Sequence, residues 1–372
     1  MSKVFLAMAV LIGGLTLVFA QEKPVGPISN EQTGYSESVA YEPRRFVEKS
    51  SKRKKEKKSK NNPDEKNKAP ENENRATPFD KDSGRLRIPV FAYDAKGKPV
   101  NDLKDSDFKL LLDGNEQEIL TFETARQPLD LVLVVDMSAS TSYQPKDIKN
   151  FVAKLAETLQ PADKIQIISF SDRFKILCES TNDKDVIKKA VNKLEPGGGT
   201  SIYEAVETIF RKFININDTQ KSIIILSDGV DTTSLKANYP TSLLTAEKNA
   251  VPVFPFYLNT FDNAQKHPGL IPNGLLRFKL SGLVGMTKEE YELGLTYLQD
   301  IALLSGGRAF EVKNLPDVKT EDLREILESL KPQYLITFKT PETAGQSPRR
   351  QLKVRINRPN LKVQARGSLL AQ

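Results

Sequence analysis

Cysteine, histidine and tryptophan are nearly missing from this chain of 372 residues, which has one cysteine, one histidine and no tryptophan. A single cysteine excludes an intramolecular disulfide, and these counts are too low for a zinc site of the usual Cys/His type. His267 lies in Lys-His-Pro-Gly without a serine or cysteine motif to pair with, so we expect a surface loop rather than a general base. We therefore expect that the chain is not an enzyme.

Long apolar runs are also scarce, and the clearest one spans residues 4–18. It follows Lys3 and ends in Val-Phe-Ala, so residues 1–20 are predicted to be a signal peptide cleaved before Gln21. The run is shorter than the roughly 20 residues that a membrane helix needs. An uncleaved N-terminal anchor stays open as the alternative. We expect a secreted or periplasmic protein with no transmembrane segment after signal cleavage.

Positive charge is concentrated in residues 49–60, which hold eight lysines or arginines against one glutamate. The surrounding segment, 21–84, has few β-branched or aromatic residues, so we expect a disordered basic and polar tether. Nucleic acid is excluded as a partner because the chain is expected to be exported and the basic block lacks interleaved aromatic residues. Contact of this block with an anionic envelope surface stays an open hypothesis.

Strand-like segments flank the centre of the chain. In 85–127, an apolar run from Leu86 to Tyr93 precedes two further runs that an Asp113-Gly114 turn joins into a predicted hairpin. The C-terminal segment, 331–372, again reads as strands. We predict that the two segments pair to form one small β-rich domain; the alternative is that each packs separately on the central domain.

The central segment, 128–330, alternates apolar strands with amphipathic helices. Its strands lack polar alternation, which indicates a parallel sheet covered on both faces. We predict an α/β fold with a doubly wound, mostly parallel sheet, and ligands of such sheets bind beyond the carboxyl ends of the strands.

Oxygen-bearing side chains gather in three loops of this domain. Asp136, Ser138 and Ser140 follow one buried strand, Thr200 follows a glycine run, and Asp228 follows another buried strand. Alternating positions can turn the first three side chains to one side. Ser201 and Glu204 form a capping-box pattern, which would leave the Thr200 hydroxyl free. Each motif alone favours helix capping and loop filling, but the three in order favour a site for a hard cation such as Mg²⁺.

These residues resemble a known motif. Asp136-x-Ser138-x-Ser140, Thr200 after glycines and Ser227-Asp228-Gly229 are similar to the metal-ion-dependent adhesion site of von Willebrand factor type A domains, over about residues 129–330. Flanking motifs, including Ser305-Gly306-Gly307 and Arg366-Gly367, resemble the exported "VWFA-related" proteins of Acidobacteria and similar bacteria. The chain departs from that family at Ser368, where a tyrosine is common.

The resemblance implies a role for each residue. Ser138 and Ser140 would bind Mg²⁺ directly, Thr200 directly in a ligand-bound state, and Asp136 and Asp228 directly or through water. Mn²⁺ or Ca²⁺ would also suit such ligands. Asp172, Asp231 and Ser142 are neighbouring oxygen donors that the motif does not assign to the ion.

The implied function is binding of a protein partner whose Asp or Glu carboxylate completes the coordination of the ion. Two alternatives stay open: an accessory or scaffold subunit of an envelope complex with a structural metal site, and a Mg²⁺-dependent hydrolase. Residues 259–292 form an insertion-like apolar stretch, which either covers the domain's own surface or binds a partner.

Overall fold

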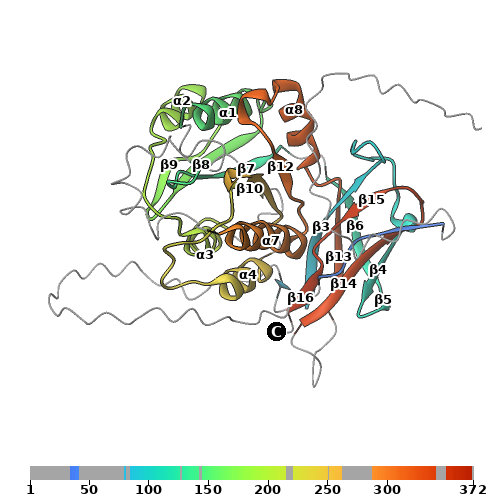
Figure 1. Cartoon of the computed structure of the whole chain (residues 1–372). Coiled ribbons are helices and arrows are strands. Elements are labelled where there is room, and N and C mark those ends of the chain that lie inside the picture. The colour runs from blue at the N-terminus through green and yellow to red at the C-terminus, as the bar shows by residue number, and fades with distance from the viewer. Residues whose placement is uncertain are drawn as a thin grey trace, which may run out of the picture.

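The computed structural model describes residues 34–41, 79–80, 84–125, 128–141, 145–214, 221–249, 251–261, 287–340 and 349–370 (Figure 1). The predicted signal peptide and most of the predicted tether, including 49–60, lie outside these residues. Within the described ranges, no helix has both the length and the apolar character to cross a membrane.

A six-stranded sheet forms the centre of the α/β part. Its order is β12-β11-β10-β7-β8-β9, and every neighbouring pair is parallel except the one between β8 and the edge strand β9. The strands are β7 (Asp130–Asp136), β8 (Lys164–Phe170), β9 (Phe174–Thr181), β10 (Lys221–Ser227), β11 (Val253–Leu258) and β12 (Phe310–Val312).

The central strands are apolar throughout because both faces of the sheet are covered. In β7, Leu131, Leu133 and Val135 enter one core, while Val132 and Val134 enter the other, as the two-residue period of a strand requires. Helices lie above and below the sheet in Figure 1. One face carries α1 (Pro145–Glu157), α2 (Lys184–Asn192), α8 (Thr320–Ser329) and the short 3₁₀ helix η2 (Leu315–Asp317); the other carries α3 (Ile202–Lys212), α4 (Tyr239–Glu247) and α7 (Lys288–Ser305).

Each helix turns one apolar stripe to the sheet. In α1, Ile148, Phe151, Val152 and Leu155 are buried, which is the three- and four-residue spacing of one helix face. The predicted α/β fold with a doubly wound, mostly parallel sheet is confirmed.

Two antiparallel sheets form the predicted small β-rich domain, a sandwich built from both flanks of the chain. Strand β3 pairs with β13, and β4 pairs with β14, so segments from before and after the α/β domain lie side by side. One sheet contains β15 (Lys362–Gln364), β3 (Arg85–Tyr93), β13 (Tyr334–Lys339), β6 (Ile119–Thr124) and β2 (Phe79–Asp80); the other contains β1 (Ser36–Glu37), β14 (Arg349–Ile356), β4 (Phe108–Leu112), β5 (Asn115–Gln117) and β16 (Ser368–Leu370), with the 3₁₀ helix η1 (Asp105–Asp107) before β4.

Two local predictions need correction. The Asp113-Gly114 turn, with φ of 51° and 83°, joins β4 only to the short strand β5. After residue 118 the chain changes sheets, so β6 pairs with β13 rather than with β4. Within the predicted tether, β1 pairs with β14, and Ser36 is fully buried. Residues 34–41 are therefore part of the sandwich, and the expectation of disorder is wrong for them.

The sandwich and the α/β domain share a core. Strand β3 ends in Phe91 and Tyr93, which belong to one of the two cores of the central sheet. The Phe91 ring meets that of Phe254 edge-on with centroids 5.6 Å apart, and the Tyr93 hydroxyl donates to the carbonyl of Ser329 at 2.6 Å.

A buried carboxylate forms a second joint. Glu247, at the end of α4, accepts two hydrogen bonds from Arg349, at 2.8 and 2.6 Å, and one from the Ser368 hydroxyl. Its backbone carbonyl accepts a hydrogen bond from Arg366, a guanidinium whose pKa burial lowers to about 10, opposed by the charge of Glu247. This network joins α4 to the C-terminal strands.

Removal of the Glu247 carboxylate is expected to destabilise the whole chain. Glu247→Ala leaves Arg366 buried near no compensating charge, and breaking a buried pair in this way costs about 3–5 kcal/mol. Urea denaturation followed by circular dichroism measures the change. The control is Glu116→Ala, which removes an exposed ion pair with Lys109 and is expected to change stability by less than about 1 kcal/mol. Equal effects of the two variants would contradict the structural role of Glu247.

Candidate metal centre

Asp136 and Asp228 lie at the carboxyl ends of two neighbouring parallel strands. Asp136 is the last residue of β7, and Asp228 directly follows β10. The chain moves from β7 to β8 on one side, while β10 pairs on the other, so the strand order reverses here. Such switch points are the usual ligand sites of open α/β sheets. Both carboxylates are completely buried.

The loop after β7 folds back around Asp136. The Ser138 backbone N–H donates to Asp136 Oδ1 at 2.9 Å, and the Ser138 and Ser140 hydroxyl oxygens are 3.2 Å apart. Ser140 also makes a side-chain hydrogen bond to Asp228. The three residues of the first motif are therefore gathered at one point, together with Asp228.

Thr200 reaches the same region from the glycine run. The Ala139 N–H donates to the Gly198 carbonyl, and the Gly197 N–H donates to the Met137 carbonyl, so the two loops are joined by backbone hydrogen bonds. The Thr200 hydroxyl is fully buried, yet its oxygen has no hydrogen-bond partner. A buried polar atom left unpaired is uncommon and costs about 1–3 kcal/mol. Its position suits a metal ligand.

The start of α3 differs from the predicted capping box. The Ser201 hydroxyl pairs with Thr233 and makes no cap hydrogen bond, and the Glu204 carboxylate accepts from the Leu235 and Lys236 N–H groups. Instead, Asp231 accepts from the Tyr203 N–H and caps the helix. The capping box was therefore wrong, although the Thr200 hydroxyl is free as expected.

The other oxygen donors near the motif make separate contacts. Asp172 is more than one-third exposed and accepts from the Ser171 hydroxyl at 3.0 Å and the Gly198 N–H at 3.3 Å. Asp231 is occupied by α3 and by Ser234. Ser142 lies outside the described residues.

Three further hydroxyls were not predicted to take part in the site. Ser227 donates to Asp136 Oδ2 at 2.6 Å, Thr141 donates to the Asp136 carbonyl at 2.9 Å, and Thr260 donates to Asp228 Oδ2 at 2.7 Å. Ser227 stands inside the Ser-Asp-Gly motif, and Thr141 directly follows Ser140. Thr260 could have been found only from its place after β11, the next strand of the sheet.

Burial and like charge dominate the electrostatics of the centre. Loss of solvation, followed by the nearby charge of Asp228, raises the pKa of Asp136 to about 7, although hydrogen bonds from Ser138 and Ser227 oppose the shift. Burial also raises the pKa of Asp228, against hydrogen bonds from Thr260 and Ser140. Two adjacent buried carboxylates with raised pKa values form a site that favours a cation.

The apolar stretch at 259–292 begins and ends beside the centre. Thr260 bonds to Asp228, and a Cβ on Gly294 would lie 2.7 Å from the backbone carbon of Gly229, so α7 touches the loop directly. Gly229 has φ of 76°, which only glycine adopts without strain. The middle of the stretch lies outside the described residues.

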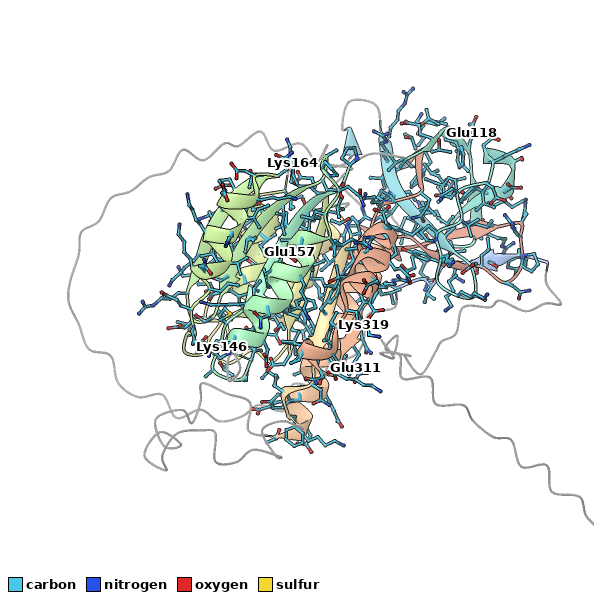
Figure 2. All side chains as sticks on the ribbon, turned by 90° about the horizontal axis from the view of Figure 1, so that it is seen from above. Glu118, Lys146, Glu157, Lys164, Glu311 and Lys319 are labelled. Carbon is cyan, nitrogen blue, oxygen red and sulfur yellow. The ribbon has the colours of Figure 1, made fainter. Side chains whose placement is uncertain are left out.

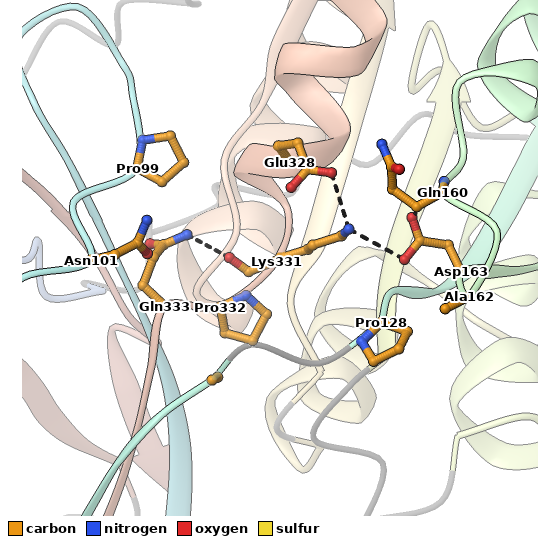
Figure 3. Close-up of a pocket in the computed structure, with 11 residues that line it drawn as sticks. Pro99, Asn101, Pro128, Gln160, Ala162, Asp163, Glu328, Lys331, Pro332 and Gln333 are labelled. Atoms are coloured by element: carbon orange, nitrogen blue, oxygen red, sulfur yellow. Dashed lines mark hydrogen bonds and ion pairs between the residues drawn. The ribbon is translucent and has the colours of Figure 1, made fainter.

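A pocket of about 410 Å³ lies elsewhere, at the junction with the sandwich (Figure 3). Lys331 crosses it and pairs with Asp163 at 3.3 Å and Glu328 at 3.0 Å. Asp163 precedes β8, so the pocket is at the amino ends of the strands, roughly 20 Å from the carboxylate centre along a strand of this length. Figure 2 shows the two ends of the domain, with Lys146 at one and Lys164 at the other.

The donor set of the centre explains one negative finding. Among the described residues, no group of three or more His, Cys, Asp or Glu side chains is arranged to hold a metal ion. The centre has two carboxylates, and its other oxygen atoms belong to hydroxyl groups, which are suitable ligands for hard cations.

Comparison with known proteins identifies the α/β part. Residues 131–230 match the family model of the von Willebrand factor type A domain. The chain contains a von Willebrand factor type A domain. The resemblance seen in the sequence is confirmed at this level, while the narrower likeness of the flanks to exported VWFA-related proteins stays a prediction.

Two proteins resemble part of the chain in sequence. An uncharacterized protein of Synechocystis sp. is 32% identical over 108 residues, which are 28% of this chain and 26% of that protein. A UPF0353 protein of Mycolicibacterium paratuberculosis is 24% identical over 134 residues, which are 32% of this chain and 40% of that protein. The chain thus spans about a quarter and two fifths of these relatives.

Several solved structures are similar to the chain. The von Willebrand factor type A structure from Catenulispora acidiphila has a TM-score of 0.40 and 14% identity, covering 72% of this chain and 74% of that one. BatB from Bacteroides thetaiotaomicron has a TM-score of 0.39 and 19% identity, covering 55% and 99%. Proximal thread matrix protein 1 of the mussel byssus, solved with a zinc-occupied MIDAS motif, has a TM-score of 0.40 and 16% identity, covering 65% and 50%.

The raised pKa of Asp136 predicts how the stability of the A domain depends on pH without metal. The folded state binds a proton on the Asp136 carboxyl more tightly than the unfolded chain does. Protonation of Asp136 therefore stabilises the folded state fully below about pH 4, and this stabilisation is lost as pH rises through about 7. Thermal unfolding in EDTA should therefore give a lower Tm at about pH 8 than at about pH 5.

The control for this prediction is Asp228→Asn, which removes the neighbouring charge. The variant should lose less stability over the same interval, and the single histidine of the chain limits other titration there. An identical pH dependence for wild type and variant would show that the two carboxylates do not interact.

Proposed function

We propose that the A domain binds a divalent cation at Asp136, Ser138, Ser140, Thr200 and Asp228, and that the bound ion accepts a carboxylate from a protein partner. The observation that carries the proposal is the Thr200 hydroxyl, which is completely buried and unpaired in a loop that backbone hydrogen bonds join to the loop after Asp136. A cation would supply the missing partner of this oxygen. It would also neutralise the like charges of Asp136 and Asp228.

Mg²⁺ is the proposed ion. All five proposed ligands bind through oxygen, which hard cations prefer, and Mn²⁺ or Ca²⁺ would suit the same donors. When bound, the ion supplies a positive centre with a coordination position for an outside carboxylate. Where Asp136 and Asp228 bind the ion through water, its direct protein ligands are neutral hydroxyl groups, so the ion keeps positive charge that favours an Asp or Glu of a partner over a neutral group.

Binding rather than catalysis is the proposed role. Asp136 and Asp228, whose pKa values are raised, are the proposed ligands themselves, and the nearby Asp231 is engaged by the start of α3 and by Ser234. Export through the predicted signal peptide would place the domain in contact with envelope or secreted partners. In the alternative, an accessory or scaffold subunit of an envelope complex, the domain docks to one fixed partner and the metal site is structural.

Metal binding is expected to require Asp228. The variant Asp228→Ala removes one of two charged ligands, so its affinity for Mn²⁺, measured from the electron paramagnetic resonance signal of the free ion, should fall at least about 100-fold. The matched control is Asp172→Ala, which removes an acidic side chain of a neighbouring loop that contacts neither carboxylate. Undiminished binding by the Asp228 variant would refute the site.

Capture from envelope and culture extracts then tests the partner. The bait is the mature chain rather than a fragment starting at residue 85, because residues 34–41 belong to the sandwich. A protein retained with Mg²⁺ by wild type and Asp172→Ala, but lost with EDTA or Asp228→Ala, would support carboxylate binding. Capture that is the same with Mg²⁺ and with EDTA would contradict carboxylate binding. Hydrolysis of a phosphate ester or a peptide would favour the hydrolase alternative.

A further inference from the structure

Thr260 and Tyr291 lie close to Asp228, and neither belongs to the loop that follows Asp136. Thr260 follows β11, Tyr291 lies in the first turns of α7, and both are at least 95% buried. We propose that Thr260, supported by Tyr291, is a positioning residue that sets the metal affinity of the centre by fixing the Asp228 carboxylate. This inference rests on the proposed metal-binding function.

The hydrogen bonds at Asp228 hold both of its oxygens. Oδ1 accepts from the Val230 N–H at 3.1 Å, and Oδ2 accepts from the Thr260 hydroxyl at 2.7 Å. Two donors on different atoms fix the rotation of the carboxylate about its side-chain bond. The Val230 donor belongs to the same loop, whereas the Thr260 donor lies just after the neighbouring strand β11, so Thr260 ties Asp228 to that side of the sheet.

Tyr291 in turn holds Thr260. The Tyr291 hydroxyl lies beside Thr260, which opposes the rise that burial causes in the pKa of the tyrosine. The Tyr291 ring packs on Phe261 with centroids 5.2 Å apart. Close contact between Gly294 and Gly229 keeps α7 against the loop, so the tyrosine has little freedom to move away.

The hydrogen bond from Thr260 opposes the electrostatic repulsion between the two carboxylates. Without an ion, the charges of Asp136 and Asp228 repel each other, and a free Asp228 side chain would rotate away from its neighbour. Thr260 keeps the carboxylate in one orientation before the ion arrives, so binding does not have to order it. Partners of this kind, one step behind a ligand, commonly change metal affinity by about 10–100-fold when they are removed.

The test compares three variants by Mn²⁺ titration, using the free-ion resonance signal because the chain has no tryptophan to report binding. Thr260→Val keeps the shape and removes the hydroxyl, and its Kd should rise about 10–100-fold. Thr260→Ser restores the hydroxyl and should bind within about threefold of wild type. Tyr291→Phe removes only the phenol hydroxyl beside Thr260 and should weaken binding by a smaller factor, in the same direction.

The matched control is Thr158→Val, the same substitution at a buried threonine whose hydroxyl donates to a backbone carbonyl at the end of α1. It should leave the Kd unchanged, which separates a general loss of stability from an effect on the metal. If Thr260→Val does not fold, as judged by circular dichroism, Tyr291→Phe decides the matter.

The outcomes separate the two proposals. Wild-type protein that binds no Mn²⁺ would overturn the proposed function and this inference with it. Wild type that binds, with Thr260→Val or Tyr291→Phe binding equally well, would overturn the inference alone. Weaker binding by Thr260→Val that serine restores would support it.

Discussion

The burial of two aspartates close together is the constraint on which the rest of the A domain depends. Asp136 and Asp228 have no exposed surface, and the charge of one raises the pKa of the other. Burying a charge without compensation costs several kcal/mol. Hydrogen bonds partly compensate this cost, since Ser227 donates to Asp136 and Thr260 donates to Asp228. These neutral donors lower the cost of burying the negative charges without cancelling them. The remaining negative charge favours binding of a cation.

Close approach of the surrounding loops follows from that arrangement. The loops can converge only where side chains are absent, and a Cβ on Gly197 would lie 2.2 Å from the Ser171 hydroxyl oxygen. Gly229 and Gly294 also leave no room for a side chain, because their backbones are in direct contact. The glycine run before Thr200 therefore serves packing rather than the cradling of a phosphate group. It lets that loop come near enough to the loop after Asp136 for the backbone hydrogen bonds between them.

Sequence reasoning succeeded where the information was local. The uninterrupted apolar strands predicted a covered parallel sheet, and Asp136 and Asp228 could be placed at one edge because parallel strands end together. It failed where distant segments decide the outcome. Asp231, rather than the predicted Ser201, caps α3. Thr260 contacts Asp228 only because β11 is next to β10 in the sheet. A local sequence pattern predicts neither the path of the loop that contains Asp231 nor the order of β10 and β11 in the sheet.

Strand β1 shows why composition misled for residues 34–41. Its two residues have no apolar pattern, and Ser36 pairs with Ile356, which lies more than 300 residues further along the chain. Besides its backbone pairing with β14, the strand is held by ion pairs of Glu37 with Lys353 at 3.1 Å and Arg355 at 2.9 Å, and Tyr41 after it is buried in a core of the central sheet. Polar residues can order a strand in this way only when a finished sheet edge offers them partners. The same pairing covers part of the outer edge of β14, where open backbone groups would otherwise invite association with another chain. The segment before residue 85 thus completes the sandwich, and the sandwich shares its core with the A domain through β3.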